Sequence, residues 1–337
     1  MKRLMLALLT VITVMLPLAC GRSSDKPRVG YVTNGIASFW VIAEAGAQAA
    51  GRDFDVDVLV RMPPGDGAVN NQQRMIEELL TIEIDGIAVS PIDPVNQVGF
   101  LNTASERTTL ITHDSDAPGA NRLAYVGMDN YTAGRMCGEM VKEAMPDGGS
   151  IMIFVGRLEQ DNAKLRRQGL IDELLDRSHD RDRYDAPGKT LAGDNYTILD
   201  TRTDNFDMPT AKAQAEDAII AHPDLGCMVG LFAYNPPAIL EALKVAGKLK
   251  AIQVVAFDEH DVTLQAIVDG TCYGTVVQNP YQYGYESVRI LAGLACDDQS
   301  VLPANGFLNI PARKIRPDNV QAFWSELKRL TSSTPDA

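Results

Sequence analysis

Polar and aromatic residues recur in this sequence directly after short runs of apolar, β-branched residues. The candidates for ligand binding are Thr33, Phe39, Trp40, His113, Asp114, Asn162, Arg166, Phe206, Asn235, Asp258 and Gln278. Carboxylate, amide and guanidinium groups can each grip neighbouring hydroxyl groups, and aromatic faces can cover the apolar faces of a ring. A polar residue at the end of one strand is expected wherever a chain leaves a core. Because such residues recur in both halves of the chain, they indicate a ligand-binding site. This inventory predicts a polyhydroxylated ligand.

The usual catalytic signatures are absent: the sequence has no GxSxG, no HExxH and no GxGxxG after its first apolar run. Gly188-Lys189-Thr190 resembles the end of a phosphate-binding loop, but the earlier Gly that such a loop requires falls at Arg183. The histidines are scattered and form no metal pattern. We therefore expect no enzyme, no cofactor and no metal. The open alternative is a sugar-processing enzyme in which Asp114 and Asp258 form a proton-transfer pair.

Residues 1–20 predict a secretory signal. A basic start precedes an apolar run from Leu4 to Leu18, which ends at Ala19-Cys20-Gly21. This run is too short to span a bilayer comfortably and ends in small residues, as cleaved export signals do. We predict export to the periplasm or cell surface, with a lipidated Cys20 as membrane anchor and residues 21–27 as a tether. Pro17 replaces the usual lipoprotein Leu, so ordinary cleavage near Ala19 is the alternative.

The formal net charge is -13. An acidic chain repels nucleic-acid phosphates and anionic membrane surfaces, so neither is expected as a partner of the folded part. The 337 residues are 45% hydrophobic, which is enough for about two domains. Four further cysteines show no CxxC spacing and are expected to be small buried residues: Cys137, Cys227, Cys272 and Cys296.

Segments typical of strands and helices alternate along the rest of the chain. Predicted strands lie at 29–32, 56–60, 86–90, 109–113 and 125–128, and again at 151–155, 197–199, 227–232, 252–257 and 275–277. Predicted helices lie at 39–51, 70–82, 94–107, 163–175, 209–221, 237–246, 281–294 and 317–330, with a polar loop at 178–195 and an extended stretch at 307–310. Because these strands are apolar throughout, they predict two doubly wound α/β lobes with parallel sheets and a ligand cleft between them.

Several motifs carry a resemblance to a known family. They are Val255-Ala256-Phe257-Asp258, Ile267-Val268-Asp269-Gly270, Thr275-Val276-Val277-Gln278, Asp85-Gly86-Ile87 with Ser90-Pro91, Asp129-Asn130 with Ala133-Gly134, and Asn162-Ala163 with Arg166 and Gly169. Over residues 28–315 the chain resembles the type I periplasmic sugar-binding proteins of ABC transporters, in the ribose-binding group. The resemblance implies that a monomer captures a small sugar or polyol by lobe closure and delivers it to an ABC permease in the inner membrane.

The resemblance also implies roles for individual residues. The sugar would be held by Asp114, Arg166, Phe206, Asn235, Asp258 and Gln278. Thr33 would supply a small hydroxyl group, and Phe39 and Trp40 would sandwich the ring. Asp258 and Arg166 would bind sugar hydroxyls as acceptor and donor, each partly neutralising the other.

Four departures from the ribose group concern the ligand. Ser115 stands where that group has an Arg, and Ala37 where it has an Asn. Pro236-Pro237 replaces a usually acidic position, and residues 178–195 are an insertion. Two lost polar contacts in the first lobe predict a sugar of different stereochemistry, a sugar alcohol or a deoxysugar.

The resemblance implies a three-stranded hinge, with crossings near 129–130, 278–279 and 307–309. The expected division is a signal peptide (1–20), a tether (21–27), an N-terminal lobe (28–129 plus 279–307) and a C-terminal lobe (130–278 plus 308–330). The same lobes also serve as ligand sensors for chemoreceptors, sensor kinases or autoinducer systems, which is the alternative function. A regulator of the lactose-repressor type would need a DNA-binding helix-turn-helix where the signal segment stands.

Overall fold

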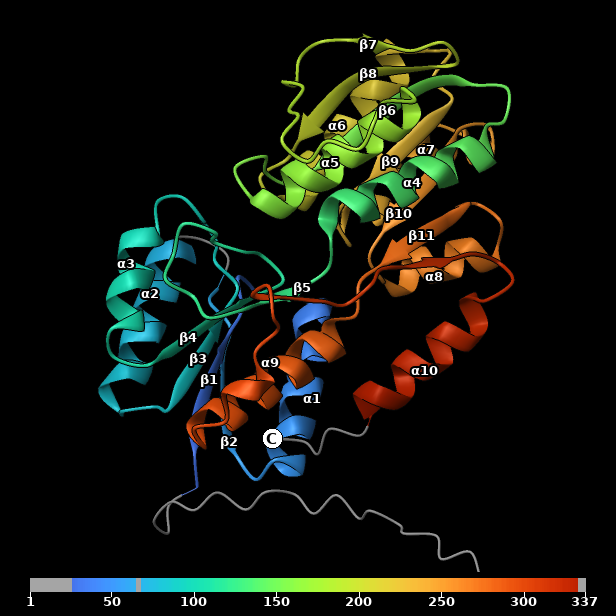
Figure 1. Cartoon of the computed structure of the whole chain (residues 1–337). Helices are drawn as coiled ribbons and strands as arrows, with labels where there is room; N and C mark the ends of the chain where they lie inside the picture. Colours follow the sequence, from blue (N-terminus) through green and yellow to red (C-terminus); the bar gives the residue numbers. More distant parts are fainter. Residues whose placement is uncertain (1–25, 65–67, 333–337) are drawn as a thin grey trace, which may run out of the picture.

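The computed structural model describes residues 26–64 and 68–332, which form two lobes stacked one above the other in Figure 1. Each lobe is a mostly parallel sheet with helices on both faces, as the uniformly apolar strands predict. The predicted α/β fold class is therefore confirmed. No helix of the described residues is long and apolar enough to cross a membrane. The predicted signal peptide and the lipidation site Cys20 lie outside the described residues.

The first lobe contains a six-stranded parallel sheet in the order β12-β5-β4-β3-β1-β2. Its strands are β1 (Arg28–Val32), β2 (Asp57–Arg61), β3 (Gly86–Val89), β4 (Thr109–His113), β5 (Tyr125–Gly127) and β12 (Phe307–Asn309). In Figure 1, one face is covered by α2 (Ala68–Thr81) and α3 (Val98–Ser105), and the other by α1 (Ser38–Asp53) and α9 (Pro280–Ala295).

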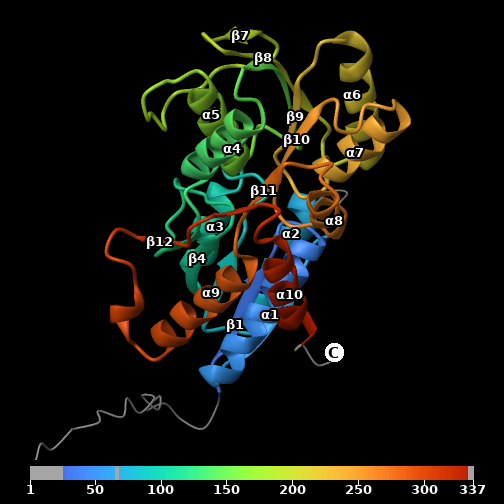
Figure 2. The ribbon, with the colours of Figure 1, turned by 90° about the vertical axis from the view of Figure 1, so that its right-hand side faces the viewer.

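The second lobe contains a seven-stranded sheet in the order β13-β11-β10-β9-β6-β8-β7, with antiparallel edge strands. Its strands are β6 (Gly149–Val155), β7 (Leu191–Ala192), β8 (Tyr196–Thr203), β9 (Cys227–Gly230), β10 (Gln253–Phe257), β11 (Gly274–Val277) and β13 (Arg313–Ile315). Figure 2 shows one face covered by α4 (Asn130–Ala144) and α5 (Asp161–Leu174), and the other by α6 (Met208–Ala221), α7 (Asn235–Val245) and α8 (Asp261–Val268).

One pair of helices in each lobe packs backbone against backbone through glycines. A Cβ atom on Gly46 of α1 would lie 1.9 Å from the carbonyl oxygen of Tyr281 in α9. Likewise, a Cβ atom on Gly134 of α4 would lie 2.0 Å from the carbonyl oxygen of Arg166 in α5. Only glycine permits this approach, and in the second lobe it fixes the helix that carries the predicted site arginine.

Three segments cross between the lobes. The chain passes from β5 to α4, from β11 to α9 and from β12 to β13. The sequence placed the third boundary after residue 307, but Leu308 and Asn309 pair with β5 in the first sheet. The first lobe therefore continues through Asn309, because these residues complete the edge of its sheet.

Local boundaries differ from the sequence predictions at polar segments. The helix predicted at 94–107 is α3 and begins only at Val98, because the Asp93 side chain accepts from the Val95 and Asn96 amides and forms a turn first. The predicted loop 178–195 contains the short edge strand β7. Strand β8 continues to Thr203 beyond its apolar part through its pairing with β6, while β7 pairs only with Thr197 and Ile198 on its outer side.

The C-terminal helix α10 (Val320–Ser332) lies beside both lobes. Its Val320 and Phe323 side chains are buried in the core of the second lobe. The helix also contacts α1 of the first lobe and α8 of the second, next to which it lies in Figures 1 and 2. Three of the four cysteines are buried free thiols, in agreement with the sequence expectation: Cys137, Cys227 and Cys272. Cys296 was also expected to be buried but is exposed, because it lies directly after the last turn of α9.

Candidate ligand-binding site

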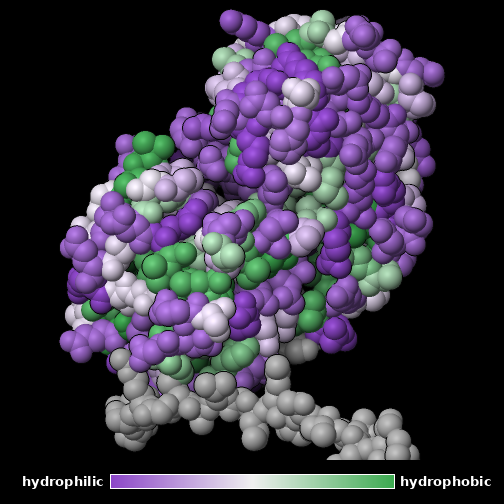
Figure 3. Space-filling model, in the orientation of Figure 1, coloured by the Kyte–Doolittle hydropathy of each residue, from purple (hydrophilic) through white to green (hydrophobic). Residues whose placement is uncertain are grey.

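The carboxyl ends of the two sheets bring together one charged group from the first lobe and two from the second. Asp114 directly follows β4, Asp258 directly follows β10, and Arg166 lies on α5. Arg166 Nη1 is 3.8 Å from Asp258 Oδ2, and both of these charges act on the pKa of Asp114. All three side chains are buried. The surface is hollowed along the boundary between the lobes (Figure 3).

The first-lobe aspartate is surrounded by neutral groups of its own lobe. Asp114 Oδ2 accepts from Ser90 Oγ (3.1 Å) and lies 3.5 Å from Asn34 Nδ2. Burial raises the pKa of Asp114 to about 7; Arg166 opposes this shift and the Asp258 carboxylate adds to it. Asp114 can therefore be a hydrogen-bond donor or an acceptor near neutral pH.

Arg166 is held in one orientation by its own lobe. Nη1 donates to the carbonyl oxygen of Leu231 (2.7 Å), and Nη2 donates to Asn130 Oδ1 (3.0 Å). The guanidinium lies 3.8 Å from the centroid of the Phe257 ring, close enough for a cation–π contact. Its Nε is buried and has no hydrogen-bond partner among the described residues. Because buried donors are normally paired, this unpaired Nε marks Arg166 as a candidate contact for a ligand oxygen.

Asp258 is linked to the first lobe through Gln278, which begins the second crossing segment. Gln278 Nε2 donates to Asp258 Oδ1 (2.7 Å), and Tyr283 of α9 donates its hydroxyl to Gln278 Oε1 (3.1 Å). Burial raises the pKa of Asp258, while Arg166 and Gln278 act against the shift. Both polar atoms of Gln278 are thus engaged, so it orients the carboxylate that it contacts.

Both aspartates adopt the left-handed backbone conformation, with φ of 57° at Asp114 and 64° at Asp258. Their amides donate to the neighbouring strand, at Val126 and Val276. The carbonyl of Asp114 accepts from the Tyr125 hydroxyl, and that of Asp258 from the Thr275 hydroxyl, each at 2.7 Å. Such φ values are unfavourable outside glycine, and hydrogen bonds on both sides hold each aspartate in place.

His113 belongs to an aromatic cluster inside the first lobe. Its ring stacks on Tyr31 (4.1 Å) and meets Trp40 edge to face (5.8 Å). Nε2 is 3.1 Å from the Val32 carbonyl, which can only accept, so Nε2 carries the proton and Nδ1 accepts from the Tyr31 hydroxyl. Burial lowers the pKa of His113 to about 3. With both nitrogens engaged, this neutral side chain supports the wall of the site.

The predicted first-lobe aromatic pair is buried but does not form two parallel plates. The rings of Phe39 and Trp40 meet at 86°, with centroids 4.8 Å apart. The structure therefore does not support a sandwich between these two rings. Thr33 is also buried, and its hydroxyl donates to the Gly35 carbonyl (2.7 Å), which leaves the oxygen as an acceptor.

A second aromatic ring for such a sandwich lies in the other lobe. Phe206 follows β8, is 40% exposed, and packs edge to face on Phe232. Asp204 accepts from the Phe206 amide (2.9 Å) and from Asn235 Nδ2 (2.8 Å), and the Phe232 amide donates to Asn235 Oδ1 (3.1 Å). The Asn235 amide is therefore engaged within its lobe, where it supports the loop that presents Phe206.

Asn162 lies at the start of the helix that carries Arg166. Its side chain is buried, and its Oδ1 accepts from the Ala163 amide (2.8 Å). The described residues contain no group of three His, Cys, Asp or Glu side chains placed to hold a metal.

Several contributors were not predicted as site residues: Asn34, Ser90, Asn130, Asp204 and Tyr283. Ser90 and Asn34 follow β3 and β1, at the same sheet edge as Asp114, so their strand-end positions were the available signal. The hydrogen bond from Tyr283 to Gln278 depends on the packing of α9, which local sequence does not specify.

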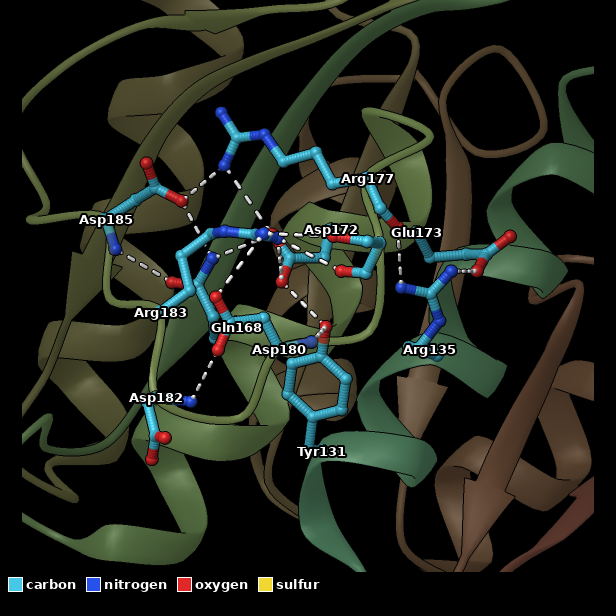
Figure 4. Close-up of polar contacts among 11 residues, drawn as sticks. Tyr131, Arg135, Gln168, Asp172, Glu173, Arg177, Asp180, Asp182, Arg183 and Asp185 are labelled. Atoms are coloured by element: carbon cyan, nitrogen blue, oxygen red, sulfur yellow. Dashed lines mark hydrogen bonds and ion pairs between the residues drawn. The ribbon is translucent and has the colours of Figure 1, made fainter.

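The insertion 178–195 is anchored on the second lobe by a buried carboxylate (Figure 4). Asp172 accepts from the Tyr131 hydroxyl (2.7 Å), lies 2.9 Å from Arg183 and 3.5 Å from Arg177. Arg181 of the insertion reaches Asp129 at the first crossing, at 3.4 Å. The insertion is thus tied to α4 and α5 next to the hinge.

Comparison with known proteins gives a family model and several relatives. Residues 29–299 match the model described as periplasmic binding protein domain. The D-ribose/D-allose-binding protein of Pseudomonas aeruginosa is 23% identical over 290 residues, which are 82% of this chain and 86% of the relative. The ribose import binding protein of Escherichia coli is 22% identical, over 74% of this chain and 78% of the relative.

Solved structures share the fold. An ABC transporter solute-binding protein from Burkholderia graminis, in complex with D-arabinose, superposes with a TM-score of 0.80 at 22% identity and covers 89% of this chain and 99% of its own. One from Agrobacterium vitis, bound with α-D-tagatopyranose, gives 0.79 at 20% identity, over 90% and 99%.

Proposed function

The chain belongs to the periplasmic binding protein domain family, and from this premise we propose that it captures a small sugar or sugar alcohol between its lobes and delivers it to an ABC importer. The observation that carries the proposal is the buried cluster of Asp114, Arg166 and Asp258, in which charges of the second lobe act on the carboxyl group of the first and Arg166 Nε is unpaired. The relatives named for ribose and allose, and the neighbours holding D-arabinose or tagatopyranose, support this class of ligand.

In this proposal the polar groups divide into those that touch the ligand and those that position them. Asp114, Asp258 and Arg166 bind hydroxyls, with Asn162 and Thr33 beside them. Phe206 covers one face of the ring, and the Phe39–Trp40 pair closes the other side. The remaining predicted residues, whose polar atoms are engaged within the protein, orient this wall: His113, Asn235 and Gln278.

Closure follows from the distribution of these groups over the two lobes. A ligand that contacts Asp114 in one lobe and Arg166 with Asp258 in the other makes all its contacts only when the lobes meet. It therefore favours the closed state by its differential contacts, through rotation about the three crossing segments. No covalent step is required, and an importer in the inner membrane would recognise the closed monomer.

The first lobe limits the number of hydroxyls that the ligand presents. Ser115 offers one buried hydroxyl, unpaired among the described residues, where the ribose-binding group has an Arg with several donors, and Ala37 offers no polar side chain. Fewer polar groups here than in the ribose-binding group favour a deoxysugar, a sugar alcohol or a sugar of different stereochemistry, because an unmatched hydroxyl would be buried without a partner. Export by the signal peptide and anchoring through Cys20 complete the proposal.

A thermal-shift screen against pentoses, hexoses, deoxysugars and sugar alcohols tests the function. A ligand at 100 times its dissociation constant should stabilise the protein by about 2.7 kcal/mol. Asp258→Ala should abolish the shift and retain the fold, while Asp269→Ala, on the exposed end of α8, should leave the shift unchanged. If no sugar or sugar alcohol raises the melting temperature, or Asp258→Ala binds like the natural chain, the proposal fails.

A further inference from the structure

A second pocket lies outside the candidate sugar site, where the two lobes meet α10. It has a volume of about 340 Å³ and is lined by α1 of the first lobe, by residues 259–261 at the start of α8, and by α10. Val41, Ile42 and Leu327 form an apolar wall, Trp324 adds an aromatic ring, and Glu259 borders the pocket with both carboxyl oxygens buried. A molecule held there would contact both lobes and the C-terminal helix.

Glu259 has no role in the sugar site, although it follows Asp258 directly. Its side chain is 3% exposed, and neither carboxylate oxygen has a hydrogen-bond partner among the described residues. Burial, with repulsion from Asp258, raises the pKa of Glu259 well above its usual range. A buried carboxyl without partners is costly for the fold, and a cation beside it would remove much of that cost.

Two cations lie near Glu259: Lys328 lines the pocket, and the charge of Arg313, which lies outside the pocket lining, opposes the raised pKa of Glu259. Arg313 lies 3.7 Å from Glu326, and the ammonium of Lys328 lies 4.1 Å from the centroid of the Trp324 ring. No ion pair joins either of them to Glu259 within the described part of the chain. The Trp324 indole donates to Asp261 (2.7 Å), which fixes this ring as a wall of the pocket.

The residues that line the pocket determine which kind of cation it can bind. No group of three metal-ligating side chains occurs among the described residues, so the donor set does not suit a metal ion. Apolar side chains from α1 and α10 surround one buried acid, a combination that suits one positive charge on a short hydrocarbon chain. We propose that this pocket binds a small primary amine, whose ammonium group pairs with Glu259 and whose alkyl chain packs against Ile42, Leu327 and Trp324.

The two tryptophans of the sequence provide separate reporters, since Trp324 lines this pocket and Trp40 lies in the first-lobe aromatic cluster. Protein labelled with 5-fluorotryptophan should be titrated by ¹⁹F NMR with butylammonium chloride in an amine-free buffer. We expect a saturable shift of the Trp324 resonance, and butan-1-ol should bind at least about tenfold more weakly because it lacks the charge.

Matched variants assign the binding to the carboxylate. Glu259→Gln keeps the shape and should lose butylammonium binding at least about tenfold, whereas Glu216→Gln, an exposed side chain on α6, should bind like the natural chain. A shift that does not saturate, or equal binding by Glu259→Gln, overturns the proposal. The Trp40 resonance and sugar-induced stabilisation report the sugar site separately, so either proposal can fail without the other.

Discussion

The two lobes contain the same backbone arrangement in different electrostatic surroundings. In each lobe an aspartate follows a central strand in the left-handed conformation, and a hydroxyl of the next strand donates to its carbonyl. The registers correspond, because Thr112 pairs with Tyr125 as Ala256 pairs with Thr275. The first lobe then offers Asp114 only neutral donors, whereas the second places a guanidinium beside its aspartate.

This difference shows how one fold can place an aspartate in two electrostatic surroundings that would bind hydroxyl groups differently. In the second lobe, Arg166 and Gln278 favour the ionised form of Asp258 and hold a fixed donor next to a fixed acceptor. In the first lobe, burial raises the pKa of Asp114 to about 7, so its charge depends on pH. We therefore expect the second lobe to supply most of the affinity and the first lobe to tune it.

The largest effect is expected from removing the charge that distinguishes the second lobe. Arg166→Met leaves two buried carboxylates without their cation, so sugar affinity should fall at least about 100-fold. The free energy of unfolding should fall by about 3–5 kcal/mol. Calorimetric titration and urea unfolding measure these changes, and Lys164→Met on the same helix is the control. If Arg166→Met bound the sugar with normal affinity, the second lobe would not supply most of the affinity.

A smaller effect, on pH dependence, is expected from the first lobe. The pKa of Asp114 is higher in the folded chain than in the unfolded chain, so the folded state binds more protons between about pH 4 and 7 and loses stability as pH rises through this window. Asp114→Asn does not ionise and should escape this loss. At about pH 8 the free energy of unfolding of Asp114→Asn, measured with urea, should be a few kcal/mol higher than that of the natural chain. At about pH 4 this difference should vanish.

Asp269→Asn, on the exposed end of α8, is the control for this pH series and should follow the natural chain at every pH. Parallel stability curves for Asp114→Asn and the natural chain would show that Asp114 is not the pH-sensitive group.

The smallest effect is expected from the hydrogen bond to the aspartate carbonyl that both lobes contain. Tyr125→Phe and Thr275→Val each remove the hydroxyl that donates to the carbonyl of an aspartate. Each should lower the free energy of unfolding by about 1 kcal/mol, to a similar extent in both lobes. Tyr184→Phe, on an exposed side chain, should change nothing. A large loss for one variant and none for the other would mean that the two arrangements are not equivalent.

Much of the architecture could be predicted from the sequence because uniformly apolar strands alternate with amphipathic helices, and this pattern depends on local residues. The two lobes followed from the repetition of that pattern. The third crossing was placed too early because β12 is a three-residue edge strand with partly exposed side chains, so its apolar signal is weak.

The site was predicted less completely than the fold. Strand-end positions brought Asp114 and Asp258 to the lobe boundary, and the motif around Asn162 placed Arg166 there. Sequence could not show that the polar atoms of Asn235 and His113 are already engaged, because their partners come from other strands and loops. Such long-range hydrogen bonds decide which polar side chains at strand ends are already engaged within the protein and which keep free donors or acceptors.

The central claim, that one ligand joins both lobes at the charged cluster, is tested most directly by a crystal structure with the sugar or sugar alcohol found in the screen. The account predicts ligand hydroxyls hydrogen-bonded to the Asp114 and Asp258 carboxylates and to Arg166 Nε, with the ring against Phe206. A ligand bound to one lobe alone, or located elsewhere while Arg166 Nε stays unpaired, would contradict it.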